Sequence, residues 1–205
     1  MKTVFSTVII ALCVIMLPLS CAKPDVGKTI LPHGVKLSEG DILFRRGTGM
    51  LSHTVIAADG GRYSHVGIVV DSSGVMMVVH AVPGEPDFPG DPDRVKMEAV
   101  DKFYSSINAS VGEVMRHNDA KAAALAAREA LRLYRIGILF DHDYDARDTT
   151  KLYCSELIER AYMHSGVSLS EGRCHDFSVP GFAFKDVIMP SDIYRCSQLK
   201  SVCKF

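Results

Sequence analysis

The sequence predicts an α+β fold, because its strand-like segments come first along the chain and its strongest helical patterns come later. Two β-branched runs at 64–70 and 75–82 are bounded by turn residues and indicate strands. Helical patterns follow at 120–135 and 151–164. This order disfavours a doubly wound parallel sheet, in which strands and helices alternate along the chain.

The segments around the first strands are short elements and turns. Residues 41–44 are expected to form a strand, and residues 49–58 a short helix that Asp59-Gly60-Gly61 ends. The sequence Asp71-Ser72-Ser73-Gly74 is typical of a hairpin loop between the two β-branched runs. Because residues 75–82 are almost continuously apolar, we expect this strand to be buried on both faces.

The second half of the chain carries the helices. Residues 95–100 alternate in polarity and predict an edge strand, and residues 112–116 predict another. Asn118 or Asp119 is the expected N-cap of the helix at 120–135, and Gly166 is expected to end the helix at 151–164. Loops and short elements are expected elsewhere, including residues 83–92, the polar stretch 141–150 and the C-terminal tail.

The N-terminus has the layout of a secretory signal peptide: Lys2, a short apolar run and then small residues. The apolar run is short for a spanning helix. Its end resembles a bacterial lipoprotein signal, in which Cys21 would be lipidated, while cleavage before Lys23 is the alternative. We therefore expect a signal at 1–22, a tether at 23–38, one domain at 39–205, and a protein exported to the cell envelope, membrane-anchored through a lipid and facing the periplasm.

Charge and cysteine content narrow the function classes. A net charge of −1 over 205 residues, without a dense Lys/Arg run, excludes nucleic acid as the expected partner. Of the four cysteines beyond the signal, Cys196 and Cys203 are candidate disulfide partners in an oxidising compartment, and the sequence leaves their pairing open.

Cys154 is the candidate nucleophile. It lies near the start of the helix at 151–164, and Leu157, Ile158 and Ala161 share its face at helical spacing. A helix N-terminus favours a thiolate, and the N–H group of Cys154 is a candidate donor to an oxyanion. The alternative is an inert cysteine that fills space in the core.

A nucleophilic cysteine needs a base, and His65 is the candidate. It opens the strand at 64–70, where its imidazole would be held rigidly; the alternative is a half-buried structural histidine. His80 lies in the neighbouring strand and could orient His65, as could Glu85 in the following loop. His53 is assigned to surface or packing.

No metal or cofactor site is predicted. The stretch 141–148 places Asp141, Asp143 and Asp145 with the spacing of a calcium loop, yet lacks the required glycine and the final glutamate, so a solvated loop is favoured. The triplet Cys174-His175-Asp176 lacks matching ligands elsewhere and is assigned to a loop.

Several short motifs together resemble the YaeF/YiiX-type permuted NlpC-like, papain-like cysteine hydrolases. The resemblance spans about residues 39–195, and the combination of a Ser-His-x-Gly and a Tyr-Cys-Ser-Glu element is its most specific part. The motifs are Gly40-Asp41-Ile42-Leu43-Phe44, Tyr63-Ser64-His65-Val66-Gly67-Ile68-Val69, Tyr144-Asp145, Tyr153-Cys154-Ser155-Glu156-Leu157 and Pro190-Ser191-Asp192.

This resemblance implies a circularly permuted papain-like fold, in which the base precedes the nucleophile. It implies an antiparallel sheet with the helix of Cys154 packed against it and Cys154 facing His65. His80 stands at the third position of the implied triad, where close relatives often have Glu. Tyr63 matches a tyrosine beside the base, with a role in the oxyanion site or in packing.

The implied activity is a cysteine hydrolase that cleaves amide or ester bonds through a thioester. Cell-envelope peptides, acylated amino acids and lipids are the candidate substrates, and the membrane is a partner through the N-terminal anchor. Two alternatives stay open: a lipid acyltransferase or lipase on the same fold, and a non-catalytic binding module.

Overall fold

A computed structural model describes residues 27–145, 147–179 and 182–205. The expected signal peptide and the lipidation candidate Cys21 lie outside these ranges. The strands are β1 (Ile42–Arg46), β2 (His65–Ser72), β3 (Val75–Val82), β4 (Arg94–Ala99), β5 (Val111–His117), β6 (Leu139–Phe140), β7 (Lys151–Leu152), β8 (His175–Val179), β9 (Phe182–Val187) and β10 (Leu199–Lys204), and the helices are α1 (Met50–Asp59), α2 (Val100–Phe103), α3 (Ala120–Arg135), α4 (Cys154–Met163) and α5 (Pro190–Tyr194).

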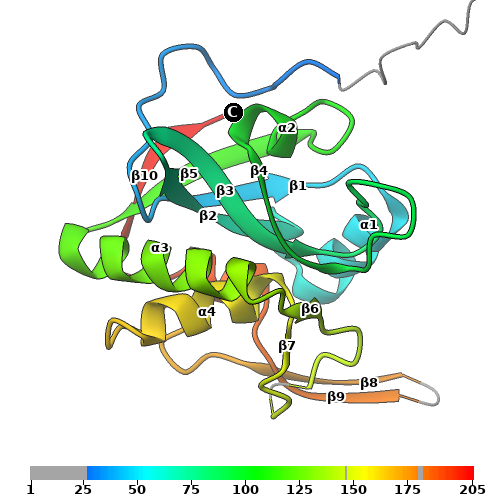
Figure 1. The fold of residues 1–205 in the computed structure, drawn as a ribbon. Coiled ribbons are helices and arrows are strands. Elements are labelled where there is room, and N and C mark those ends of the chain that lie inside the picture. Colours follow the sequence, from blue (N-terminus) through cyan, green and yellow to red (C-terminus); the bar gives the residue numbers. More distant parts are fainter. Residues whose placement is uncertain (1–26, 146, 180–181) are drawn as a thin grey trace, which may run out of the picture.

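A curled sheet organises the fold, with helices on it as the α+β prediction required (Figure 1). Its strand order is β10-β5-β1-β2-β3-β4-β6-β7, and every pairing is antiparallel except that of β6 with β7. β8 and β9 form a separate hairpin. The predicted hairpin of β2 and β3 turns at Ser73 and Gly74, which both have positive φ, as a two-residue turn requires.

The two strands predicted to be edges are covered in the structure. β5 lies between β1 and β10, because the C-terminal segment returns to the sheet as β10. β4 pairs with β3 along its length and with β6 through Arg94 and Leu139. The prediction was wrong because these neighbours come from segments distant in sequence.

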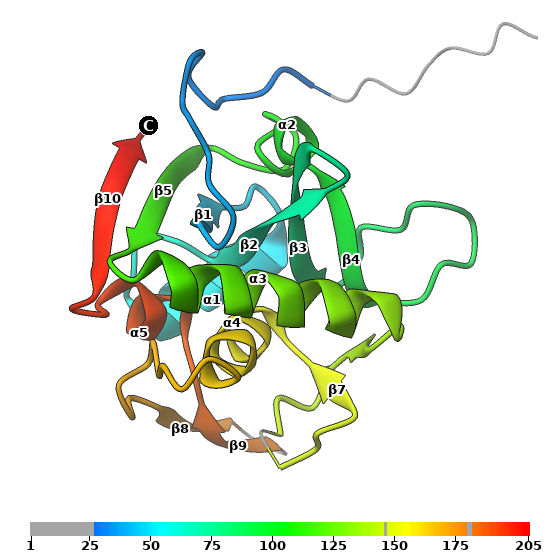
Figure 2. The ribbon, with the colours of Figure 1, turned by 60° about the vertical axis from the view of Figure 1, so that its left-hand side comes forward.

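The sheet is buried on both faces, which explains the continuous apolar runs. Ile68, Val79 and Phe44 belong to the larger core beneath α3 and α4. Leu43 and Val69 belong to a second core on the opposite face. Figure 2 shows α3 and α4 on one side of the sheet, and α2 with the N-terminal segment on the other. Each central strand therefore places apolar side chains on both faces.

The helix α3 begins and packs as its sequence predicts. Asp119 is the N-cap, and its carboxylate accepts hydrogen bonds from the N–H groups of Lys121 and Ala122 at 2.8 and 3.1 Å. The buried face carries several alanines, including Ala126 and Ala130. These small side chains let α3 lie close to β2 and α4.

The helix of the candidate nucleophile starts later than its sequence pattern indicates. Residues 151–164 were expected to be helical, but Lys151 and Leu152 pair with β6 and form β7. Tyr153 has extended backbone geometry and is the N-cap of α4. Cys154 is therefore the first residue of the helix, where N–H groups are not used within the helix.

The segment expected to be a tether packs on the domain from residue 27 onward. The backbone N–H of Ile30 donates to the carbonyl of Tyr104 at 2.8 Å, and Thr29 forms a bridge with Ser105. Ile30, Leu31, Val35 and Leu37 pack on the second core. This segment thus covers one face of the sheet.

Four cysteines lie within the described residues. Cys154, Cys174, Cys196 and Cys203 are all free thiols, so the candidate pair Cys196–Cys203 is not a disulfide. None of the helices within the described ranges is long and apolar enough to cross a membrane.

Replacing Gly67 by Ala should destabilise the protein by about 1–3 kcal/mol, because overpacking a core forces its neighbours to shift. The added Cβ would lie 2.6 Å from Cγ2 of Val78 and 3.3 Å from Cβ of His80. Urea unfolding measures the loss. Gly49→Ala is the control, since its Cβ would meet nothing within 4 Å; equal stability of the two variants would contradict the prediction.

Candidate active site

A cavity of about 500 Å³ lies where β2 begins and α4 begins. Cys154 and His65 both line it, so the structure brings the two candidate residues to one site. Its walls are mainly apolar and come from α1, from the end of β3 and from the β8–β9 hairpin. Wall residues include Leu51, Val55, Ala58, Val82, Phe177 and Phe184.

Cys154 is held at the N-terminus of α4, partly buried. Its sulfur lies 3.8 Å from the hydroxyl oxygen of Ser155, and the backbone amide of Val66 also reaches it. Since Val66 follows His65 on β2, this contact places the sulfur beside the start of that strand. The N-cap Tyr153 is anchored through its hydroxyl, which accepts a hydrogen bond from the N–H of Ile188 at 2.9 Å.

Burial dominates the ionisation of Cys154. It raises the pKa of the thiol above its usual value and outweighs the hydroxyl of Ser155 and the amide of Val66, which lower that pKa. The position at a helix N-terminus had suggested a thiolate. In the resting protein the nucleophile is instead a neutral thiol, because desolvation disfavours its charged form.

His65 is buried on the face of the sheet opposite the main packing of α4, with 7% of its surface exposed. Its ring lies 5.7 Å from that of Phe103 in the second core. Burial lowers the pKa of His65 well below its usual value, and the charge of Arg45 lowers it further. The imidazole is therefore neutral at neutral pH and can accept a proton.

His65 belongs to a linear series of polar side chains on three neighbouring strands. Nε2 of His65 lies 2.8 Å from Nδ1 of His80, and Nε2 of His80 lies 3.1 Å from Oε1 of Glu98. Because His80 occupies Nε2 of His65, Nδ1 is the ring nitrogen that is available for a second contact. The structure thus places His80 in direct contact with the ring of His65.

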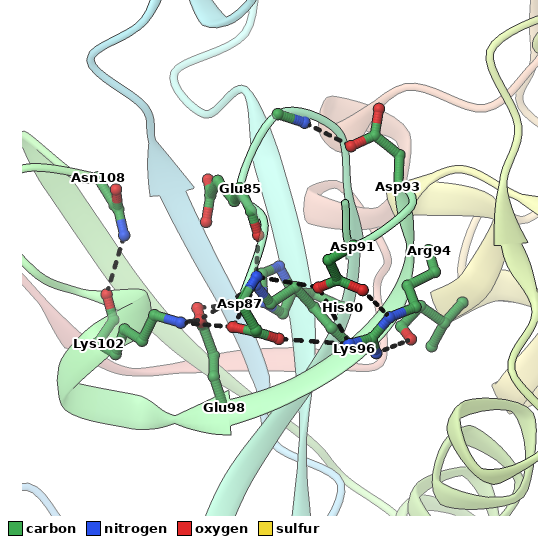
Figure 3. A network of polar contacts seen from close by, with 12 residues as sticks. His80, Glu85, Asp87, Asp91, Asp93, Arg94, Lys96, Glu98, Lys102 and Asn108 are labelled. Carbon is green, nitrogen blue, oxygen red and sulfur yellow. Dashed lines mark hydrogen bonds and ion pairs between the residues drawn. The ribbon is translucent and has the colours of Figure 1, made fainter. Parts of the chain in front are cut away.

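Glu85, the other candidate to orient the base, is engaged elsewhere. Its carboxylate pairs with the guanidinium of Arg45, and its carbonyl accepts a hydrogen bond from Lys96 at 2.6 Å (Figure 3). It lines the cavity without contacting either histidine in a described hydrogen bond. Arg45 also donates to the carbonyl of Phe103 at 2.9 Å and lies over its ring. Glu85 therefore fixes a buried cation beside His65.

Tyr63 packs rather than pointing at the reacting atoms. Its hydroxyl donates to the carboxylate of Glu113 at 2.5 Å, and its ring contacts those of Phe44 and Tyr194. It is not among the residues that line the cavity. Of its two expected roles, packing fits the structure and oxyanion binding does not. The N–H of Cys154 remains the candidate oxyanion donor.

Sequence reasoning missed Glu98 in particular. The alternating polarity of β4 was interpreted as an exposed edge, yet Lys96 and Glu98 are 2% and 5% exposed. The available signal was a pair of opposite charges, Lys96 and Glu98, two residues apart on the strand that follows the one with His80. Burial of that polar face could not be inferred without the 83–93 loop that covers it.

The other polar clusters serve local structure. The carboxylate of Asp141 accepts hydrogen bonds from the N–H groups of Asp143 and Asp145 and so forms a turn. His175 contacts Asp192, with Nε2 3.0 Å from Oδ1. Among the described residues, no three His, Cys, Asp or Glu side chains are grouped as metal ligands.

Comparison with known proteins identifies the fold and the family. No curated protein matches this chain. A crystal structure described as the metalloprotein YiiX from Escherichia coli O157:H7 is similar, with a TM-score of 0.66 and 20% identity, over 82% of this chain and 97% of that one. The His, Cys, Asp and Glu side chains of the described residues are not grouped in a way that fits a metal ion. The model of the permuted papain-like amidase family YaeF/YiiX, C92, matches residues 36–203. The chain therefore belongs to the YaeF/YiiX family of permuted papain-like amidases.

Proposed function

We propose that this protein is a cysteine amidase with Cys154 as nucleophile, His65 as general base and His80 as the residue that orients the base. The observation that carries the proposal is a single cavity lined by a thiol at a helix N-terminus and by a buried neutral imidazole. The Nε2 atom of that imidazole is already occupied by His80. Nucleophile, base and orienting group are the parts that covalent acyl transfer needs.

The reaction follows from the protonation states. His65 takes the proton of the Cys154 thiol as the sulfur attacks the amide carbonyl, and the N–H of Cys154 donates to the oxyanion. The C–N bond breaks, and His65 gives its proton to the leaving amine. Water then attacks the thioester and loses a proton to His65, which returns it to the sulfur. The products are a carboxylic acid and an amine.

The walls of the cavity favour a substrate with an apolar acyl group. Side chains from α1 and from the β8–β9 hairpin, such as Val55, Ala58 and Phe184, offer surface to hydrocarbon rather than to a polar peptide. An acylated amino acid or lipidated peptide of the cell envelope fits this chemistry. A lipid acyl donor fits it as well, so an acyltransferase or lipase is the second candidate. Export and a lipid anchor at Cys21 would place the enzyme at the membrane.

Cys154→Ala and His65→Ala should each lower amide hydrolysis at least about 10³-fold, because each removes a partner of the acyl-transfer step. Release of amine from N-acyl amino acids of increasing chain length measures the activity. Cys196→Ala, at a buried thiol outside the cavity, is the control and should stay active. Full activity in the Cys154 variant would refute the mechanism, and thioester transfer to an acceptor faster than to water would favour the acyltransferase.

Hydrolysis should persist at about pH 6, where an ordinary imidazole is largely protonated. A base acts when unprotonated, so kcat/KM should fall only as pH drops through the lowered pKa of His65. The raised pKa of Cys154 predicts, in turn, slow iodoacetamide labelling at this pH. A pH profile of both rates tests the neutral pair; labelling that is fast and constant from pH 5 to 8 would instead show a thiolate–imidazolium pair.

Ala58→Phe should raise KM for long acyl chains by about tenfold or more, with little effect on short ones, because it fills part of the cavity. Ala58 lines the cavity from α1, and its exposed neighbour Ala57 does not. Ala57→Phe is therefore the matched control for added bulk on the same helix. Equal KM values in the two variants across all chain lengths would show that the acyl group binds elsewhere.

A further inference from the structure

We infer that Glu98 is a positioning residue that acts through His80 to keep Nδ1 of His65 unprotonated, facing the nucleophile. This inference rests on the proposed function, since it concerns the base of that reaction. It extends the expected series of three groups to a fourth, on β4. Figure 3 shows Glu98 beside His80 and Lys102.

The assignment follows from which atoms can donate. A carboxylate only accepts, and Oε1 of Glu98 lies 3.1 Å from Nε2 of His80, so this contact favours a proton of His80 on Nε2. In a neutral imidazole the other nitrogen, Nδ1, is then an acceptor. Nδ1 of His80 lies 2.8 Å from Nε2 of His65, so His65 donates from Nε2. Its remaining nitrogen, Nδ1, carries a lone pair and can take a proton.

The surroundings of Glu98 keep it an acceptor. Its second oxygen, Oε2, lies 3.2 Å from Nζ of Lys102 and 4.0 Å from Nζ of Lys96. Both ammonium groups are tied to Oδ1 of Asp87, at 2.8 and 2.9 Å. Burial alone would raise the pKa of Glu98, but the contacts with His80 and then with Lys102 hold it at about 2. The carboxylate is thus ionised throughout the neutral range.

The two oxygens of the Glu98 carboxylate face different neighbours, so Glu98 does more than form an ion pair with the lysines. Oε2 faces the lysines and Oε1 faces His80. On the far side of the series, Arg45 contributes positive charge near His65, and Glu85 pairs with that arginine. The negative charge at Glu98, beyond His80, favours a proton on Nε2 of His65 rather than on Nδ1.

Glu98→Gln tests the inference with little change in shape. The lysines attract the amide oxygen to the Oε2 position, which turns the NH₂ group toward His80. His80 must then accept at Nε2 and donate from Nδ1, and His65 is left with its proton on Nδ1, facing Cys154. The same carboxylate-to-amide exchange in a serine-protease triad costs about 10⁴ in kcat. Here we expect kcat to fall about 10²-fold or more, with KM nearly unchanged.

The control is Glu129→Gln, a buried carboxylate on α3 that pairs with Arg132 and lies outside the series. It should keep kcat within about twofold. Thermal unfolding of both variants shows whether either has lost its fold. A Glu98→Gln variant that is folded and retains the wild-type kcat would overturn the inference.

A spectroscopic readout separates this inference from the proposed function. The ¹⁵N shifts of His65 in the full chain, assigned by comparison with His65→Gln, report which ring nitrogen carries the proton. We expect a proton on Nε2 in the wild type and on Nδ1 in Glu98→Gln. A wild-type proton on Nδ1 would overturn the inference even in an active enzyme. The expected exchange of tautomers in a protein without amidase activity would support it while refuting the proposed function.

Discussion

The antiparallel pairing of β2 with β3 is the constraint on which the site depends. The register that places Ile68 opposite Val79 puts His65 and His80 on one face of the sheet, close enough to share a proton. A slip of one residue would move His80 to the other face and break this contact. Gly67 lies between them and leaves room for His80, since a side chain at this position would collide with β3. The register of this hairpin therefore determines both the pairing of the central strands and the position of His65 relative to His80.

Burial then determines how the site can react. It raises the pKa of Cys154 and lowers that of His65, so the reactive pair rests as thiol and imidazole. The same burial would raise the pKa of Glu98, but the contacts with His80 and then with Lys102 keep its carboxylate charged. A charged carboxylate is thus connected to His65 through His80 without contacting it. Glu98 lies at the end of the series, where the ammonium group of Lys102, 3.2 Å from Oε2, helps to offset its desolvation.

The two faces of the sheet contribute different parts of the site. The candidate nucleophile Cys154 lies on α4 and packs with the larger core, whereas the candidate base His65 lies against Phe103 of the second core. They meet at the start of β2, where the cavity opens and α1 and the β8–β9 hairpin supply apolar walls. The segment from residue 27 and α2 cover the second face (Figure 2), and Phe103 of α2 lies against the rings of both histidines.

The sequence by itself determined the order of the elements and the hairpin, narrowed the N-cap of α3 to Asn118 or Asp119, and nominated Cys154, His65 and His80, because local patterns and short motifs carry this information. It misplaced the start of α4, since the pairing of Lys151 and Leu152 with β6 depends on a segment distant in the chain. Only the tertiary structure assigned Tyr63 to Glu113, paired Glu85 with Arg45 and brought Glu98 to His80. These contacts join residues on different elements, and their strength comes from burial, which no local pattern of residues specifies.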